Sequence, residues 1–379
     1  MNARPLRRLR VLQVLPALDH GGAENVAEAL ATGVDPARFE MLVCCTRGLG
    51  PIAERISAGG IRVELAGPRE RPNPYAALWH LNGAVRRMAP DVIHTHGITS
   101  LCDVGTIDMV RRVPQWIHTF HYGNYPYKLR SHMMLERLMA RRPERLVAVA
   151  DAQRRAIIEL HGTPPARIVT ILNGVRGNVF AATPGHRERK RTELGVGFDT
   201  FLVGAVAVLS EQKGITHLLD AVRLVVRRRT DVRVIIAGGG PLEGLLRQQA
   251  SALGLDRQVT FLGWRNDVPE ILPALDAWVM SSLWEAMPLA LLEAMAARLP
   301  IVVTGVSDNA QIVGEGEAGI LVPPGAAAPL ADAIDRLAGD PDLRARLAAT
   351  AFERYSRLYS QSHMSMRYQE LYEGLVRQP

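Results

Sequence analysis

The sequence predicts an α/β protein built from two doubly wound, Rossmann-like domains that face a cleft. The chain has 379 residues, about twice the size of one common domain. Short, continuously apolar runs alternate with helical stretches, as in parallel sheets covered on both faces. The alternation is interrupted by one polar passage, residues 181–200, and then begins again. We therefore expect an N-terminal domain over residues 1–179 and a C-terminal domain over residues 180–379, whose last helices pack back on the first domain.

The apolar runs in each half have the length of buried strands. In the first half they are Leu9–Leu15, Phe39–Cys45, Arg62–Leu65, Asp91–Thr95, Trp116–Thr119, Leu146–Ala150 and Ile168–Leu172. In the second half they are Phe201–Val208, Val232–Ala237, Val259–Leu262, Ala277–Met280 and Ile301–Val303. Helices are expected at Glu24–Ala31, Tyr75–Met88, Ile215–Arg228, Leu242–Leu253, Leu289–Arg298 and Leu330–Leu337, with one or two more over residues 343–376.

Composition narrows the class of protein. Three cysteines without a pairing pattern fit a reducing compartment, and no apolar run is long enough to span a bilayer. We therefore expect a cytoplasmic protein, with peripheral attachment to the inner face of the cell membrane as an option. Residues 1–175 hold 23 Lys and Arg against 15 Asp and Glu, which favours an anionic partner such as a phosphate-bearing acceptor or an acidic membrane surface. The alternative is an arginine-rich composition without a partner; nucleic acid is not expected, because no basic helix with interleaved aromatic residues occurs.

The strongest chemical signal lies between two expected strands of the second half. Glu285 is expected in a loop and Glu293 inside an almost wholly apolar helix, for which Pro288 suits the first turn. A carboxylate on a buried helix is costly without a partner, and sugar hydroxyls are good partners. The free N–H groups at the start of such a helix also form a phosphate site. The alternative is that Glu293 pairs with a buried arginine and that Glu285 is an ordinary loop residue.

Seven further short motifs follow one another along the chain. They are Gly21-Gly22-Ala23-Glu24 after the first strand, DVIHTHG with His94 and His96, HTFH ending in His121, ILNGV with Asn173-Gly174, AVLSEQKG ending in Lys213-Gly214, IIAGGGPL with Gly238 to Gly240, and VTFLGW with Gly263. With the two glutamates, this series resembles the retaining family-4 glycosyltransferases of the GT-B fold over nearly the whole chain. The resemblance implies transfer of a sugar from a nucleotide-activated donor with retention of configuration.

The resemblance also implies roles for individual residues. In that family the first glutamate of the pair, here Glu285, faces the donor sugar, and the second, here Glu293, faces the ribose. A histidine in the place of His121 lies beside the sugar and its phosphate. Lys213 follows a strand, where its charge would neutralise the departing diphosphate. We expect His121, Lys213 and Glu285 to be catalytic.

Other residues are expected to bind the donor. The turn Gly21-Gly22 would allow a close backbone approach and offer N–H groups to an oxyanion. The remaining expected donor-binding residues are Gly263, Met287, Pro288, Leu289 and Glu293. No metal and no cofactor is expected, since the nucleotide-sugar donor is itself a substrate. The resemblance favours UDP over GDP as the nucleotide of that donor. Asp340-Pro341-Asp342 is read as a capping turn. His94 and His96 are expected to point to opposite faces of their strand.

Three positions depart from the family pattern. An arginine usually stands where this chain has Val208, and the loss of one charge-assisted phosphate contact would cost about 1.5–3 kcal/mol. Arg176 stands where Asp is usual, and Arg176 or another nearby cation is the candidate replacement. Residues 307–311 replace a pair of glycines and a glutamate.

The sequence therefore predicts a hexosyltransferase of cell-surface polysaccharide or glycoconjugate synthesis. Two alternatives remain open. One is a sugar-nucleotide epimerase or hydrolase, and the other a non-catalytic binder or scaffold of a glycan-assembly complex. Val208 favours the scaffold, whereas Glu285, Glu293 and Lys213 disfavour it. Residues 122–142 mix aromatic residues, methionines and arginines, and are expected either to touch a lipid-linked acceptor or membrane, or to pack as an ordinary helix.

Overall fold

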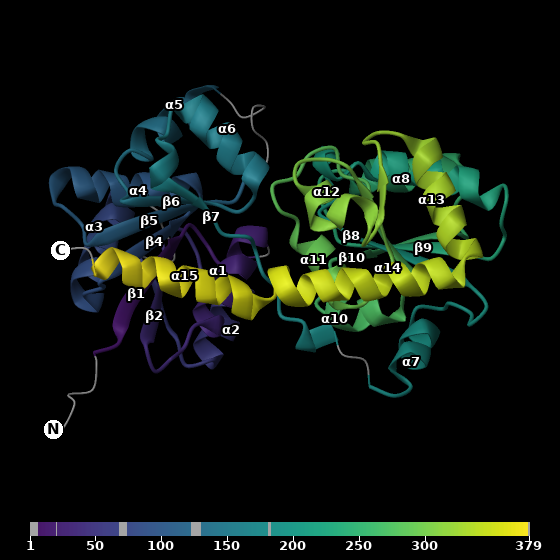
Figure 1. Cartoon of the computed structure of the whole chain (residues 1–379), viewed down its shortest axis with the longest axis horizontal. Coiled ribbons are helices and arrows are strands. Elements are labelled where there is room, and N and C mark those ends of the chain that lie inside the picture. The colour runs from purple at the N-terminus through teal and green to yellow at the C-terminus, as the bar shows by residue number, and fades with distance from the viewer. Residues whose placement is uncertain (1–6, 20, 68–73, 123–129, 181–182, 378–379) are drawn as a thin grey trace. The chain divides into compact units, whose positions relative to one another are not determined.

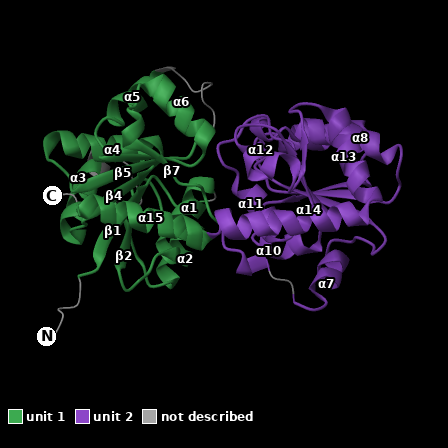
Figure 2. Ribbon diagram, in the orientation of Figure 1, with its two compact units in different colours: residues 1–174, 361–379 green, residues 175–360 purple. Residues whose placement is uncertain are grey.

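The computed structural model describes residues 7–19, 21–67, 74–122, 130–180 and 183–377. Contacts divide the chain into two compact units (Figure 2). The N-terminal unit comprises residues 1–174 together with 361–379, and the second unit comprises residues 175–360. The chain therefore passes from the first unit to the second after residue 174, a few residues before the boundary expected from the sequence. The last helix belongs to the N-terminal unit.

The N-terminal unit contains a seven-stranded parallel sheet in the order β3-β2-β1-β4-β5-β6-β7 (Figure 1). Its strands are β1 (Leu9–Leu15), β2 (Phe39–Cys45), β3 (Arg62–Leu65), β4 (Val92–His96), β5 (Gln115–Phe120), β6 (Arg145–Ala148) and β7 (Ile168–Thr170). Its helices are α1 (Gly22–Gly33), α2 (Pro51–Ala58), α3 (Pro74–Met88), α4 (Gly97–Val110), α5 (Arg130–Met139), α6 (Asp151–His161) and α15 (Gln361–Val376).

The second unit contains a six-stranded parallel sheet in the order β10-β9-β8-β11-β12-β13. Its strands are β8 (Phe201–Val206), β9 (Val232–Ala237), β10 (Val259–Gly263), β11 (Ala277–Met280), β12 (Ile301–Thr304) and β13 (Ile320–Val322). Its helices are α7 (His186–Glu193), α8 (Ile215–Val226), α9 (Glu243–Ala252), α10 (Val268–Ile271), α11 (Leu289–Ala296), α12 (Asn309–Ile312), α13 (Ala327–Gly339) and α14 (Pro341–Arg354).

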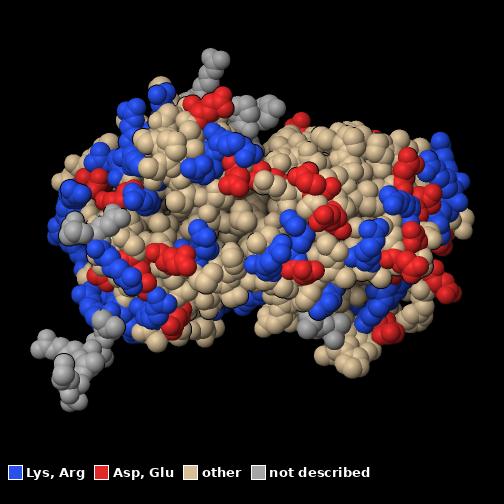
Figure 3. All heavy atoms as spheres, in the orientation of Figure 1, with Lys and Arg blue, Asp and Glu red and all other residues tan. Residues whose placement is uncertain are grey.

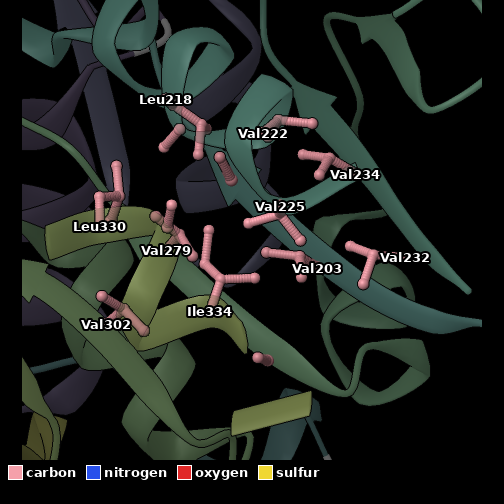
Figure 4. Close-up of a cluster of buried hydrophobic side chains, with 14 of the residues drawn as sticks. Val203, Leu218, Val222, Val225, Val232, Val234, Val279, Val302, Leu330 and Ile334 are labelled. Carbon is pink, nitrogen blue, oxygen red and sulfur yellow. The ribbon is translucent and has the colours of Figure 1, made fainter. Parts of the chain in front are cut away.

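The core of the second unit explains why its strands are apolar without alternation. Helices α8 and α13 lay one apolar face over the sheet, so that Leu218 and Ile334 meet Val203 and Val279 (Figure 4). The strands are covered on both faces, and polar residues on either face would lose their hydration.

The secondary structure follows the expected alternation, with two informative differences and one confirmed detail. Strand β13 was not expected, because its three residues, Ile320–Val322, are too few to show a pattern. The polar passage at residues 181–200 contains helix α7, whose residues are mostly charged. Asp340 caps α14 by accepting a hydrogen bond from the Leu343 N–H at 2.9 Å, which confirms the capping turn. Among the described residues, no helix is both long and apolar enough to cross a membrane.

The strand order places the expected site residues within each unit. In an open parallel sheet, ligands bind beyond the carboxyl ends of the strands where the order reverses. That point lies between β1 and β4 in the N-terminal unit and between β8 and β11 in the second. The chain that follows β1 leads to Gly21-Gly22, and the loops after β8 and β11 carry Lys213 and Glu285.

Candidate functional site

A partly buried ion pair lies at the switch point of the second unit. Lys213 Nζ donates to Glu285 Oε1 at 2.6 Å, and the Glu285 side chain is 5% exposed. Ser282 Oγ donates to the same carboxylate oxygen at 2.7 Å, and Gln212 Nε2 donates to the other at 3.2 Å. A carboxylate has about four acceptor positions, so Glu285 is held in place and still has room to accept from a ligand hydroxyl.

Local backbone geometry brings Lys213 and Glu285 together. Lys213 ends a short 3-10 turn, and Gly214 follows it with φ +57°, a conformation that favours glycine. A Cβ at Gly214 would lie 2.2 Å from the Ser281 carbonyl oxygen, so the two loops can meet only at a glycine. The Ser281 hydroxyl then donates to the Lys213 carbonyl at 2.9 Å. No role was expected from the sequence for the other two partners of Glu285, which are Gln212 and Ser282. Gln212 precedes Lys213 and Ser282 follows a strand, and these positions could have marked both as site residues.

Glu293 lies within α11, as expected, and its environment is unusual. Burial raises the pKa of this carboxyl from its ordinary value to about 7. Among the described residues, no arginine or other side chain forms an ion pair or hydrogen bond with it, so the alternative of a buried arginine partner is not observed. A half-buried carboxylate without a protein partner is suited to accept hydrogen bonds from ligand hydroxyls.

The start of α11 lies between these two glutamates. The helix begins at Leu289, and Pro288 stands one position earlier than expected, at the N-cap. No side chain caps this end, and the first N–H groups of a helix have no partner within it. Met287 and Pro288 are buried, and these residues hold the helix start in place. The end of α11 that carries partial positive charge is thereby available to an anion.

A glycine turn after β9 forms another edge of the site. Gly238 has φ +134°, and its N–H donates to the Gly263 carbonyl at the end of β10 at 2.7 Å. The indole of Trp264 lies over Gly239, because a Cβ there would be 2.5 Å from Trp264 Nε1. The Trp264 ring is 59% exposed and offers an aromatic face beside Gly263. Arg265 is held by Asp267 and Glu193 through ion pairs, so its charge is balanced by protein carboxylates.

The N-terminal unit contributes a separate set of residues at its own switch point. Gly21 precedes α1 in extended conformation without a side-chain cap, and a Cβ at Gly22 would meet open space. Glu24 folds back toward Gly21, and burial, with a smaller effect of Asp19, raises the pKa of the Glu24 carboxyl. Space beside the turn is therefore open at Gly22 and filled by the Glu24 carboxylate at Gly21, and donor binding by this turn stays a prediction.

Histidines from β4 and the end of β5 form a buried cluster. The expectation that His94 and His96 point to opposite faces is wrong, because residues two apart on a strand share a face. Their ring centroids lie 4.0 Å apart. His94 contacts the Tyr372 hydroxyl at 2.8 Å and the Thr119 hydroxyl at 2.7 Å. Tyr372 lies on α15, so the last helix supports the cluster from more than 270 residues away, a pairing that the sequence pattern did not reveal.

The cluster determines what His121 can do. His96 Nδ1 lies 2.9 Å from His121 Nε2, and burial lowers the pKa of His121 to about 4, so both rings are neutral near pH 7. His96 Nε2 is buried without a partner in the described structure. An orphaned N–H is rarer than an orphaned acceptor, which favours the tautomer in which His96 Nδ1–H donates to His121. His121 then carries its proton on Nδ1 and offers a hydrogen bond rather than a positive charge.

Val208 lies at the edge of the ion-pair site. It follows β8, is 42% exposed, and stands where the family usually has an arginine. Arg176 is exposed, and its role as a replacement stays a prediction.

We expect Val208→Arg to restore a charge-assisted phosphate contact and to tighten nucleoside diphosphate binding by about 10- to 100-fold. Calorimetric titration with UDP measures the change. Val208→Gln is the matched control, since it adds length and polarity without charge. Equal affinities of the Arg and Gln variants would show that Val208 does not face the phosphates.

Within the described part of the chain, no group of three or more His, Cys, Asp or Glu side chains is arranged to hold a metal ion.

Comparison with known proteins places the chain in a family. Residues 20–176 match the model described as Glycosyltransferase Family 4, and residues 186–354 match the one described as Glycosyl transferases group 1. The chain belongs to the family-4 glycosyltransferases of the GT-B fold. The Anabaena protein Alr3699/HepE, crystallised in complex with UDP and glucose, has the same fold as this family-4 chain: the TM-score is 0.87 at 24% identity, over 97% of this chain and 100% of that one.

Several relatives of this chain have named activities. The family-4 chain is 29% identical over 240 residues to UDP-Gal:alpha-D-GlcNAc-diphosphoundecaprenol alpha-1,3-galactosyltransferase of Escherichia coli. That match spans 61% of this chain and 62% of the relative, slightly less than two thirds of its length. The chain is also 29% identical over 381 residues to D-inositol 3-phosphate glycosyltransferase of Mycobacterium bovis, which spans 91% of this chain and 77% of the relative.

Proposed function

We propose that this protein is a metal-independent, retaining hexosyltransferase that moves a sugar from a UDP-sugar to an acceptor hydroxyl. The observation that carries the proposal is the Lys213–Glu285 pair at the switch point of the second unit. The uncapped start of α11 and the partnerless Glu293 lie on the helix that follows Glu285. Together these groups supply a cation, helix N–H donors and carboxylate acceptors, which match a diphosphate and sugar hydroxyls.

The same residues define the proposed chemistry. The bond between the sugar carbon and the diphosphate oxygen breaks, and negative charge develops on the diphosphate. Lys213 and the N-terminus of α11 stabilise that charge, while Glu285 holds the sugar and Glu293 the ribose. His121, neutral and donating from Nδ1, fixes a sugar or phosphate oxygen. The acceptor oxygen forms the new bond on the face that the diphosphate leaves, and the proton of the acceptor hydroxyl passes to the departing diphosphate.

The comparisons support the choice of substrates. The Escherichia coli relative is named for a UDP-Gal donor and a diphosphoundecaprenol-linked acceptor, and the Anabaena structure contains UDP and glucose. We propose a UDP-hexose donor, a sugar or lipid-linked acceptor, and a role in cell-surface polysaccharide or glycoconjugate synthesis. We also propose that the protein works at the inner, anionic surface of the cell membrane, which the basic first half of the chain supports.

A product assay tests the proposal. The protein is incubated with UDP- and GDP-sugars in the presence of EDTA and a panel of polyprenyl-diphosphate sugars, and products are identified by mass spectrometry and by the anomeric NMR coupling. We expect one UDP-sugar to give a glycosylated acceptor with the anomeric configuration of the donor. Free sugar alone would indicate a hydrolase, and an altered nucleotide sugar an epimerase. Donor binding without turnover would favour the scaffold alternative, for which Val208 is the specific observation.

A further inference from the structure

The N-terminal unit contains a small pocket beside the end of α5 that none of the proposed chemistry uses. Its cationic lining residues are Arg137 and Arg141 from the end of α5 and Arg167 before β7, and His161, Gly162 and Thr163 at the end of α6 complete most of the wall. We propose that this pocket binds the phosphate of an anionic lipid head group and so fixes the protein on the membrane. The proposal names the surface by which the membrane attachment proposed above would occur, and it does not depend on transferase activity.

The charge in the pocket is not balanced by carboxylates. No aspartate or glutamate belongs to its lining. Elsewhere in the unit, arginines such as Arg55 and Arg142 have acidic partners, Glu28 and Asp108. Among the described residues, neither Arg137 nor Arg141 forms a side-chain hydrogen bond or an ion pair. Free guanidinium groups that converge on a pocket are suited to bind phosphate bidentately.

Negative charges near the pocket reduce its excess of positive charge but do not remove it. Helices α5 and α6 both end here, and each C-terminus carries about half a negative charge. Together with the carboxylate of Glu136, which lies near His161 of the lining, these helix ends leave the three guanidinium groups an excess of about one positive charge, the size of the charge on a phosphodiester head group. The buried carboxylate of Glu136 has its Oε2 3.7 Å from Nε2 of His161, which lines the pocket. Arg167 donates to the carbonyls of Arg141 and Pro143 and thereby holds the segment after α5.

A second feature of the pocket points to a polar ligand. Thr163 lines it and is only 9% exposed, yet its hydroxyl forms no hydrogen bond with another described residue. Because no described residue satisfies this hydroxyl, it is available to a ligand or to water. The pocket has a volume of about 270 Å³. Sites for drug-sized ligands begin near about 300 Å³, so this pocket suits a head-group phosphate rather than a whole nucleotide sugar.

Exposed apolar side chains beside the pocket favour a lipid over a soluble phosphate. Met134 is 74% exposed, Leu138 is 51% exposed and Leu135 is 41% exposed, all on α5. Met134 and Leu138 are four residues apart, so they share a face of the helix, and Arg137 and Arg141 follow them. Figure 3 shows Lys and Arg side chains around α5 on the visible face. An interfacial helix combines these features: apolar side chains enter the acyl boundary while the cations meet the head groups.

Vesicle sedimentation tests the proposal with the full chain. We expect capture by phosphatidylcholine vesicles that contain phosphatidylglycerol, and little capture by phosphatidylcholine alone. The pocket variant Arg137→Gln/Arg141→Gln should weaken capture by about 30-fold, from about 1 kcal/mol for each charge near the surface. The matched control is Arg227→Gln/Arg346→Gln, which removes the same charge from exposed positions of the second unit. Equal losses in the two variants would overturn the proposal.

A substitution that leaves the charge unchanged distinguishes binding in the pocket from attraction to a charged surface. Thr163→Val keeps the net charge and removes the hydroxyl, and we expect it to weaken capture several-fold without lowering the melting temperature. Unchanged capture by Thr163→Val would overturn the pocket assignment. Calorimetric binding of inorganic phosphate that is lost in Arg137→Gln/Arg141→Gln, without vesicle capture of the parent protein, would overturn the lipid assignment.

Transfer to a soluble acceptor is followed in the same preparations. We expect it to be unchanged in the pocket variants, so that failure of the lipid site is distinguished from failure of the transferase.

Discussion

Replacing Lys213 by methionine is expected to lower turnover by about 100- to 1000-fold, with a smaller effect on donor affinity. Lys213 is the cation at the switch point of the second unit, and its charge acts most strongly when negative charge develops on the departing diphosphate. Methionine keeps the length and apolar part of the side chain and removes the charge. Single-turnover kinetics with the active UDP-sugar measure the chemical step directly.

The ion pair with Glu285 complicates the interpretation of this variant. Glu285 is 5% exposed, so the loss of Lys213 leaves a buried carboxylate held only by Ser282 and Gln212. We therefore expect a loss of unfolding free energy of about 1–3 kcal/mol, which Glu285→Gln in the same chain should partly restore. Turnover should not be restored with it. The matched control is Arg227→Met, the same loss of charge at an exposed position. A Lys213→Met protein with normal turnover would contradict a leaving-group role.

Replacing Glu293 by glutamine is expected to weaken donor binding at pH 8 and to stabilise the fold at the same pH. Burial raises the folded-state pKa of this carboxyl from 4.5 to about 7. The folded protein therefore holds the proton more tightly than the unfolded chain. This contribution to stability is present in full below the unfolded pKa of 4.5 and is lost as the pH rises through about 7. Glutamine does not ionise, so the variant should melt at a higher temperature than the parent at pH 8 and at a similar temperature near pH 4.5.

Donor affinity should rise with pH, whereas the stability of the parent protein falls. If the ionised carboxylate accepts the ribose hydroxyls, affinity for a nucleotide sugar should fall about 10-fold between pH 8 and pH 6. A nucleotide sugar is the correct probe, because its diphosphate bears no terminal group that titrates near pH 6. The Gln variant should bind weakly without this dependence, and the exposed Glu317→Gln variant should behave as the parent. Equal pH profiles for the parent and the Glu293 variant would show that this group does not face the donor.

Local sequence was enough to predict most strands and the two sheets. Strands β1, β2, β9 and β11 have the predicted bounds, because buried parallel strands are short, continuous and apolar and their ends are marked by Gly, Pro or polar residues. The places of Lys213, Glu285 and Glu293 after β8, after β11 and within α11 followed from the same pattern. Strand β13 did not, since three residues at a sheet edge leave no period to detect.

What local sequence could not supply was the partner of each polar side chain. The pairing of Lys213 with Glu285 depends on the approach of two loops at Gly214. The contact of His94 with Tyr372 joins residues that are far apart in the sequence but belong to the same unit. The error about His94 and His96 had a simpler cause, a misapplied strand period.

Pattern and spacing thus determined the α/β class, the repeated sheet architecture and the loops that carry the site residues, because periodicity and turn chemistry are local properties. Tertiary structure decided the ionisation and contacts of those residues. The pKa of Glu293 near 7, the neutral His121 and the unpaired arginines beside α5 all depend on burial and on neighbours brought together by folding. Desolvation and hydrogen bonding act through space, and the spacing of residues along a chain does not encode them.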